Sequence, residues 1–123
     1  MLVGLGIDLA DIGRMERALQ RYGERFASRI FSPAELAVCP GLTPAFAAGR
    51  WAAKEAAVKA LGCGFSQGIG PSHIEILPTA TGKPEMRFAG PALERARQLG
   101  VYGIHLSITH ERTTAAAVVV LEA

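Results

Sequence analysis

The sequence lacks any long hydrophobic run. Its longest uninterrupted apolar segment, residues 115–121, is seven residues long, whereas a helix that crosses a membrane needs about 20. The first eight residues contain no basic segment and include Asp8, so they do not resemble a secretory signal peptide. These two absences predict a soluble, cytoplasmic protein with no membrane partner.

Cysteine is scarce, and charge of one sign is not in excess. The two cysteines, Cys39 and Cys63, lie 24 positions apart, and neither belongs to a CxxC pair. A disulfide framework or a structural zinc site requires more ligands at closer spacing, so neither is expected. The formal net charge is only +2, which is too small to predict a nucleic-acid partner.

The composition instead describes a folded domain. Half of the 123 residues are hydrophobic, and this length fits a single domain over residues 1–123. Alternation over residues 2–9 predicts a strand. One face of this strand is hydrophobic and consists of Val3, Leu5, Ile7 and Leu9. The other face has only Gly4, Gly6 and Asp8, which is bare enough for another backbone or a ligand to come close.

A helical period follows this strand. From residue 11 to about residue 30, hydrophobic residues recur every three or four positions, and Gly23 marks a point where the helix bends or breaks. The hydrophobic stripe consists of Ile12, Met15, Leu19, Tyr22, Phe26 and Ile30. A neighbouring stripe consists of Arg14, Arg17, Arg21, Arg25 and Arg29. The arginine stripe fits either a solvated helix face or a docking surface for an acidic partner.

The remaining elements are short and regularly spaced. The expected elements are a short helix from residue 32, a long helix over 45–61, strands over 73–77 and 84–88, a helix over 91–99, and strands over 103–110 and 114–122. This order predicts an α+β fold in which a largely antiparallel sheet packs against the long helix.

Two acids and a lysine form a candidate catalytic site. Glu55 and Lys59 are four residues apart and share one face of the long helix, a spacing that by itself fits a surface ion pair. Asp8, however, shares its strand face only with glycines. A carboxylate from a strand end and one from a helix can share a Mg²⁺ ion with substrate phosphates. A nearby lysine would then neutralise charge that develops on a phosphate oxygen.

The strand over residues 103–110 has a polar face. His105, Ser107 and Thr109 alternate with hydrophobic residues, which is typical of the solvent side of a half-buried strand. The functional alternative is that these residues line a phosphate pocket. A serine nucleophile is less favoured, because Ser107 lacks the Gly-x-Ser-x-Gly turn that exposes such a residue.

Three motifs in this order resemble the phosphopantetheinyl transferase family, in particular bacterial holo-acyl-carrier-protein synthases. They are residues 4–8 (GLGID), residues 46–62 (FAAGRWAAKEAAVKALG) and residues 105–110 (HLSITH). The resemblance extends over the whole chain and implies the fold of that family. It also implies that the protein transfers phosphopantetheine from coenzyme A to a serine hydroxyl of apo-acyl carrier protein, with release of adenosine 3',5'-bisphosphate.

The resemblance assigns roles to individual residues. Asp8 and Glu55 match the family's Mg²⁺ ligands, and Lys59 matches a lysine that contacts the phosphate. The serine proton would pass to Glu55 or to a metal-bound water, and the sequence leaves this choice open. The expected contacts to coenzyme A come from Arg50, Lys59, Gly82, Lys83, Pro84 and His105.

The resemblance also implies partners. Arg14, Arg21 and Arg25 match a basic helix that binds the acidic carrier protein. Members of this type form homotrimers with active sites between subunits. The chain departs from the usual pattern at Trp51, His73 and Thr81, which affects the adenine contacts and the hairpin turn. The alternative function, from another class, is a non-enzymatic module that binds acidic partners through the arginine stripe.

Overall fold

The computed structural model describes residues 1–39 and 41–123. In chain order, the elements are β1 (Leu2–Asp11), α1 (Ile12–Tyr22), α2 (Glu24–Ile30), α3 (Pro33–Val38), α4 (Pro44–Ala60), the 3-10 turn η1 (Pro71–His73), β2 (Ile74–Pro78), β3 (Pro84–Phe88), α5 (Gly90–Gln98), β4 (Gly103–His110) and β5 (Thr114–Glu122). The predicted α+β class is confirmed. No helix within the described residues is long and apolar enough to cross a membrane.

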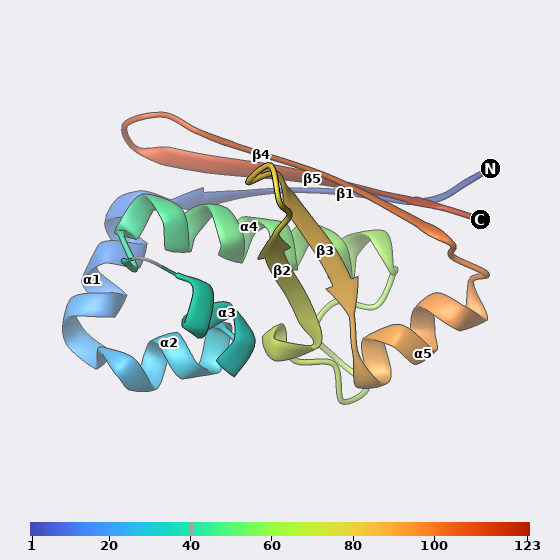
Figure 1. Cartoon of the computed structure of the whole chain (residues 1–123), viewed down its shortest axis with the longest axis horizontal. Coiled ribbons are helices and arrows are strands. Elements are labelled where there is room, and N and C mark those ends of the chain that lie inside the picture. Colours follow the sequence, from blue (N-terminus) through green and yellow to red (C-terminus); the bar gives the residue numbers. More distant parts are fainter. Residues whose placement is uncertain (40) are drawn as a thin grey trace.

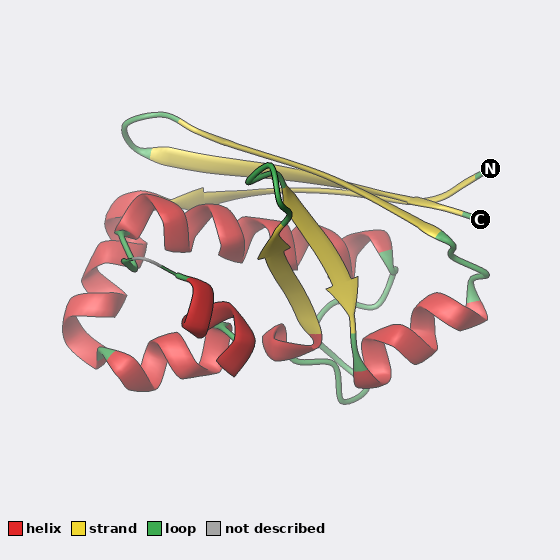
Figure 2. Ribbon diagram, viewed as in Figure 1, coloured by secondary structure: helices red, strands yellow, loops and turns green. Residues whose placement is uncertain are grey.

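The strands form two antiparallel sheets. One sheet has the order β1-β5-β4, and the other is the β2-β3 hairpin. Helix α4 runs along one face of the three-stranded sheet, and the hairpin crosses the same helix in a different direction (Figure 1). Helices α1, α2 and α3 group around one end of α4, whereas α5 lies toward the other end (Figure 2). The five strands therefore do not form the one continuous sheet that their order suggests, because the hairpin is not hydrogen-bonded to β4.

Helix α4 lies unusually close to β1. Its sheet-facing side consists of small residues, among them the fully buried Ala52 and Ala56. A Cβ atom added at Gly6 would lie 1.8 Å from the carbonyl oxygen of Ala56, and one at Gly4 would lie 2.2 Å from that of Ala60. The bare strand face predicted from the sequence is thus confirmed, and the backbone that approaches it is that of α4.

Two residues do not lie on the strand and helix faces that the sequence predicts for them. Val3 packs against the main core instead of joining the outer face, because a β-bulge between Leu2 and Gly4 shifts the register of β1. Tyr22 is 55% exposed, because the helical stripe is interrupted immediately after it. At that point Gly23 has a positive φ of 55° and separates α1 from α2.

We predict that Gly6→Ala destabilises the protein by about 3 kcal/mol, because the added methyl group would force β1 away from α4. Gly13→Ala is the matched control: Gly13 lies in α1, and its added Cβ would lie 3.3 Å from the flexible end of the Arg17 side chain and 3.6 Å from Oδ2 of Asp11, with no backbone atom in the way. We expect this control to be neutral or to stabilise by up to about 1 kcal/mol. Urea unfolding of both variants measures the difference, and equal stabilities would contradict the close packing.

Candidate active site

Asp8, Glu55 and Lys59 meet where α4 passes the edge strand β1. The ammonium group of Lys59 donates hydrogen bonds to Oδ1 of Asp8 at 2.6 Å and to the carbonyl oxygen of Ile7 at 3.1 Å. The side chain of Asp8 is 13% exposed, whereas that of Lys59 is 53% exposed. Asp8 is on the strand face that contacts α4, the helix that also carries Glu55 and Lys59. The structure therefore brings together the three residues that the sequence assigned to one site.

The charges of these residues affect one another. Burial raises the pKa of Glu55 above its ordinary value, and the neighbouring Asp8 carboxylate raises it further, while Lys59 opposes the shift. The hydrogen bond to Asp8 is the main cause that raises the pKa of Lys59. Lys59 thus stays protonated to a higher pH than an ordinary lysine, and Glu55 is a stronger base than an ordinary glutamate. Such a pair suits proton removal beside a negatively charged group.

A pocket extends from these carboxylates. It has a volume of about 440 Å³, and both Asp8 and Glu55 line it. Arg14 also lines it, together with hydrophobic side chains that include Phe26 and Ile30. Such a lining suits a molecule that has both a polar group and a less polar arm.

Trp51 lines the same pocket, one helical turn before Glu55. Its ring stacks on Phe65, with ring centroids 5.6 Å apart and an angle of 11° between the planes. This stacking holds the Trp51 side chain in one orientation next to the carboxylates. A large aromatic side chain is therefore accommodated at this position.

A second group of predicted residues lies at the opposite edge of the three-stranded sheet. His105 on β4 lines a pocket of about 210 Å³ together with Lys83 and Pro84 of the β2-β3 hairpin. Gly82 is in the turn of the same hairpin. The ring of His105 also contacts Glu122, with 2.6 Å between Nε2 and Oε1.

These two groups do not meet within one chain. Asp8 pairs in register with Ala117, whose side chain points inward to the core. His105 pairs with Val120 on the outer face, and its side chain is 60% exposed. Ser107 and Thr109 share this exposed outer face, which agrees with the solvent-side interpretation for a single chain. The interpretation that these residues line a phosphate pocket together with Asp8 is not supported within one chain.

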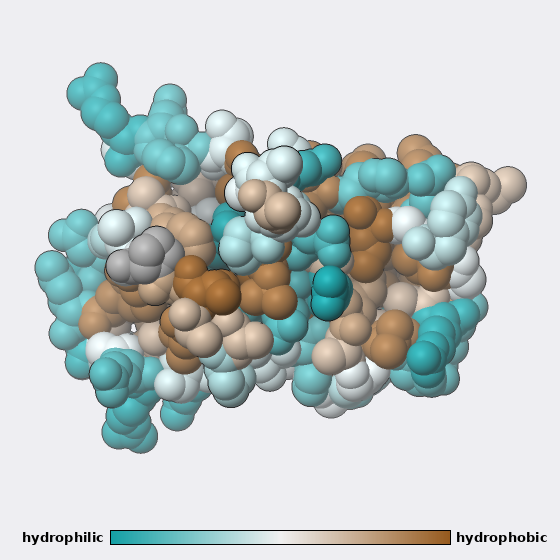
Figure 3. Space-filling view, in the orientation of Figure 1, coloured by the Kyte–Doolittle hydropathy of each residue, from teal (hydrophilic) through white to brown (hydrophobic). Residues whose placement is uncertain are grey.

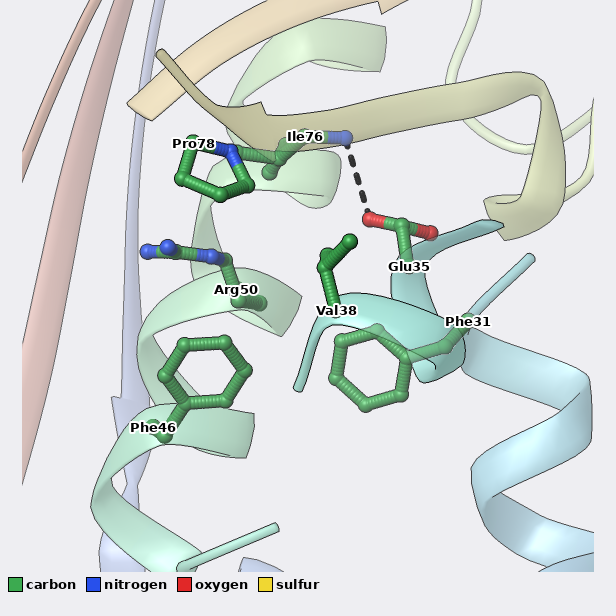
Figure 4. Close-up of a pocket in the computed structure, with 7 residues that line it drawn as sticks. All are labelled: Phe31, Glu35, Val38, Phe46, Arg50, Ile76 and Pro78. Atoms are coloured by element: carbon green, nitrogen blue, oxygen red, sulfur yellow. Dashed lines mark hydrogen bonds between the residues drawn. The ribbon is translucent and has the colours of Figure 1, made fainter. Parts of the chain in front are cut away.

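Arg50 belongs to neither of these two groups. It lines a separate, apolar pocket of about 260 Å³. Its guanidinium lies over the ring of Phe46, 4.4 Å from the centroid, and Figure 4 shows it between Phe46 and Pro78. Burial lowers the pKa of Arg50, and the charge of Glu35 partly compensates. Within the described part of the chain, Arg50 forms no salt bridge. Figure 3 shows hydrophobic residues around this region, over α3 and beside β2.

The arginine stripe remains on the surface. Arg14, Arg21 and Arg25 are all exposed, and the stripe continues from α1 into α2 across the break at Gly23. Arg21 lies over the ring of Tyr22, 5.5 Å from its centroid. Since Arg14 also lines the carboxylate pocket, this basic surface leads directly to the candidate active site.

Sequence reasoning missed a buried ion pair next to the site. Lys54 is fully buried, and its ammonium group donates to Oε1 of Glu35 at 2.6 Å, to the carbonyl oxygen of Ile30 at 2.7 Å and to that of Pro71 at 3.0 Å. Burial lowers the pKa of Lys54, and Glu35 opposes this effect. The only signal in the sequence is a lysine among the buried alanines of α4.

Glu35 joins further elements to this pair. Its Oε2 accepts a hydrogen bond from the backbone of Ile76 in β2, and its Oε1 accepts one from Ser32 at the start of α3. The pair therefore fixes α2, α3 and β2 to the helix that carries Glu55. Because Ile30 also lines the pocket at Glu55, the ion pair sets the position of one pocket wall.

Known proteins share both the sequence and the fold. Residues 4–119 match the family model of the 4'-phosphopantetheinyl transferase superfamily. A holo-(acyl-carrier-protein) synthase of Desulfovibrio desulfuricans is 56% identical over 100% of this chain and 99% of its own length. The corresponding protein of Halorhodospira halophila is 50% identical over 98% of both chains.

Solved structures of related proteins also match this chain in fold. The crystal structure of a holo-(acyl-carrier-protein) synthase from Neisseria meningitidis matches with a TM-score of 0.89 and 37% identity over 100% of both chains. That of the Helicobacter pylori protein, in complex with coenzyme A, matches with a TM-score of 0.85 and 30% identity over 96% of this chain and 99% of the other. This chain is similar to both along its length.

We predict that Lys54→Met lowers the free energy of unfolding by about 3–5 kcal/mol, because it leaves the Glu35 carboxylate buried without its cation. The double variant Lys54→Met/Glu35→Gln should recover part of this loss, since the amide is uncharged and its oxygen still accepts from Ile76, whereas the bond from Ser32 is lost. Denaturant unfolding of the single and double variants measures the recovery. A double variant less stable than Lys54→Met alone would contradict this account.

Proposed function

The chain belongs to the 4'-phosphopantetheinyl transferase superfamily, and from this premise we propose that it transfers phosphopantetheine from coenzyme A to apo-acyl carrier protein. The observation that carries this proposal is the meeting of Asp8, Glu55 and Lys59, since the two carboxylates line a pocket together with hydrophobic side chains. The relatives named above are synthases of this kind, and one of them is described with coenzyme A bound.

The reaction moves one phosphoryl group between two oxygen atoms. The serine hydroxyl of the carrier protein attacks the phosphorus that bears the pantetheine arm, and a new phosphodiester bond forms. The bond from that phosphorus to the bridging oxygen of the pyrophosphate breaks, and adenosine 3',5'-bisphosphate leaves with the electron pair. Glu55 in its ionised form accepts the serine proton, directly or through a water molecule. Lys59 balances the charge that develops on the phosphate oxygens.

We also propose that Asp8 and Glu55 hold a Mg²⁺ ion. When bound, this ion supplies positive charge at the pyrophosphate. The donor set fits, because Mg²⁺ binds through one or two carboxylates plus substrate phosphates and water. No cluster of three or more His, Cys, Asp or Glu residues occurs in the described part of the chain, so a site with many protein ligands is not supported. The contact between Asp8 and the Lys59 ammonium supports this proposal, because a cation already lies against that carboxylate.

We predict that Lys59→Met strengthens Mg²⁺ binding about 10-fold in the absence of coenzyme A, because Lys59 competes for Asp8. Titration calorimetry at a pH above the raised pKa of Glu55 measures the dissociation constant directly. Arg97→Met removes one positive charge from the exposed end of α5 and is the matched control. Weaker binding by Lys59→Met than by the control would show that Lys59 aligns Asp8 for the metal instead of competing with it.

The basic surface of α1 and α2 is proposed to bind the acidic carrier protein. Arg14 and Arg21 lie on it, and Arg14 also reaches the pocket at Asp8. Charge complementarity of this kind guides the partner toward the site. A bound carrier protein would then bring its serine close to Glu55.

Accordingly, Arg14→Glu/Arg21→Glu is predicted to raise the KM for apo-carrier protein about 10-fold or more through like-charge repulsion. The dissociation constant for coenzyme A should change by less than about twofold. The matched control is Arg97→Glu/Arg87→Glu, which reverses two exposed arginines on α5 and β3. Steady-state kinetics with a fixed, saturating coenzyme A concentration provide the comparison, and an unchanged KM in the α1 variant would refute the docking surface.

We further propose that the complete site forms between copies of the chain, in a homotrimer. The carboxylates lie at the β1 edge of the sheet, and His105 lies at the β4 edge. The two strand spacings between these edges amount to about 10 Å, and the side chains are on opposite faces of the sheet. A head-to-tail contact that brings the β4 edge of one copy to the β1 edge of the next closes into a ring when the rotation permits. The exposed outer face of β1, with Leu5, Ile7 and Leu9 each about two-thirds exposed, offers apolar surface for such a contact.

The transfer itself is tested by intact-mass spectrometry of apo-acyl carrier protein after incubation with the enzyme, coenzyme A and Mg²⁺. A gain of about 340 Da, the mass of one phosphopantetheine, is expected and should be lost with EDTA. Glu55→Ala is predicted to abolish the gain while its circular dichroism spectrum stays unchanged. If several apo-carrier proteins show no gain with folded enzyme that binds coenzyme A, the transferase proposal fails and the arginine stripe becomes the leading functional feature.

A further inference from the structure

Glu122, near the end of the chain, forms a polar cluster with two side chains of β4 and the segment before it. His105 Nε2 lies 2.6 Å from Glu122 Oε1, and the hydroxyl of Tyr102 donates to Oε2 at 3.3 Å. Glu122 is opposite Gly103 in the register of β4 and β5. It is therefore a diagonal neighbour of His105 on the outer face of the sheet.

The backbone around this cluster also holds Glu122 in place. The backbone N–H of Tyr102 donates to the carbonyl oxygen of Glu122 at 2.9 Å. A Cβ atom added at Gly103 would lie 3.3 Å from Oε1 of Glu122 and 3.5 Å from Nε2 of His105. A side chain at position 103 would thus crowd the contact between the carboxylate and the imidazole.

This contact determines which ring nitrogen of His105 is occupied. The hydrogen bond from His105 lowers the pKa of Glu122, so Glu122 is a carboxylate and only accepts hydrogen bonds. Nε2 of His105 must therefore carry a proton and donate it to Oε1. Nδ1 takes no part in this contact, and it donates to an anionic partner when it also carries a proton.

Stability does not explain the arrangement. The side chains of His105 and Glu122 are 60% and 32% exposed, and ion pairs at exposed positions contribute about 1 kcal/mol or less. His105 instead lines the 210 Å³ pocket with Lys83 of the hairpin. Two side chains suited to an anionic group thus line this pocket, and one of them is held by a carboxylate; the acid that also lines it, Glu85, is paired with Arg87.

We propose that Glu122 is a positioning residue: it fixes the ring orientation of His105 by accepting from Nε2–H, so that Nδ1, which carries a proton when the donor substrate binds, donates a hydrogen bond to an anionic group of that substrate. This inference rests on the proposed function, because the donor is coenzyme A and the anionic group is one of its phosphates. Glu122 does not itself touch the donor. It acts on affinity for coenzyme A through His105, and it leaves the chemical step at Glu55 unaffected.

The test is a double-mutant cycle on the KM for coenzyme A, with His105→Ala, Glu122→Ala and the double variant. Each single variant is expected to raise this KM about 10-fold, with kcat within about twofold of the wild type. In the His105→Ala background, Glu122→Ala should have no further effect. Glu122→Gln retains an acceptor oxygen and should recover most of the affinity, and Glu94→Ala, which removes an exposed acid from α5, should change nothing.

The outcomes separate this proposal from the proposed function. If His105→Ala raises the KM and Glu122→Ala does not, the positioning role is overturned and the coenzyme A contact stands. A further increase on adding Glu122→Ala to His105→Ala would mean that Glu122 acts independently, which also overturns it. If neither variant changes the KM while phosphopantetheine is still transferred, both the positioning role and the His105 contact fail, and the transferase function survives.

A spectroscopic measurement needs no substrate. The ¹⁵N chemical shifts of the His105 ring report which nitrogen carries the proton, and His105→Ala identifies the signals. The wild type is expected to show the proton on Nε2, and Glu122→Ala should show a mixture of tautomers. The same tautomer in both proteins would contradict the proposal.

Discussion

The contact between α4 and β1 is the constraint on which the rest of the structure depends. Gly4 and Gly6 have no side chains, so the carbonyl oxygens of Ala60 and Ala56 occupy the space where Cβ atoms would lie. Asp8 follows on the same strand face, and Glu55 and Lys59 are on the helix. A wider separation of the two backbones would take Lys59 out of reach of the Asp8 carboxylate. The glycines of β1 thus shape the candidate active site although they carry no functional group.

Two lysines of α4 show how location determines the role of a charge. Lys54 is fully buried, bound to Glu35 and two carbonyl oxygens, and its ammonium group is unavailable to any ligand. Lys59 is one and a half turns further along the helix, half exposed, and bound to an acid at the mouth of a pocket. The first lysine fixes an element that lines the pocket, and the second contacts Asp8, one of the carboxylates that line it. Removal of either should reduce function, but for different physical reasons.

Much of the site could be predicted from the sequence because its signals are local. The helical spacing of Glu55 and Lys59 and the glycine face before Asp8 placed these residues together, and the structure confirms it. The exposure of Tyr22 and the inward position of Val3 could not be predicted, since each depends on a local break in register, at Gly23 and at the β-bulge. The Lys54–Glu35 pair was also missed, because its partners are 19 residues apart and nothing in either segment indicates that they meet.

The central claim of this account is that Glu55, on α4 beside the β1 edge of the sheet, and His105, on the β4 edge, serve one active site from two copies of the chain. Co-expression of Glu55→Ala with a His105→Ala/Lys83→Ala variant tests it most directly, with transfer measured at coenzyme A concentrations well below KM. Random mixing leaves about a quarter of the shared sites with both halves intact. We therefore predict mixed oligomers with about a quarter of wild-type activity, well above either variant alone. Activity no higher than the average of the two separate variants would contradict the claim and place each complete site within one chain.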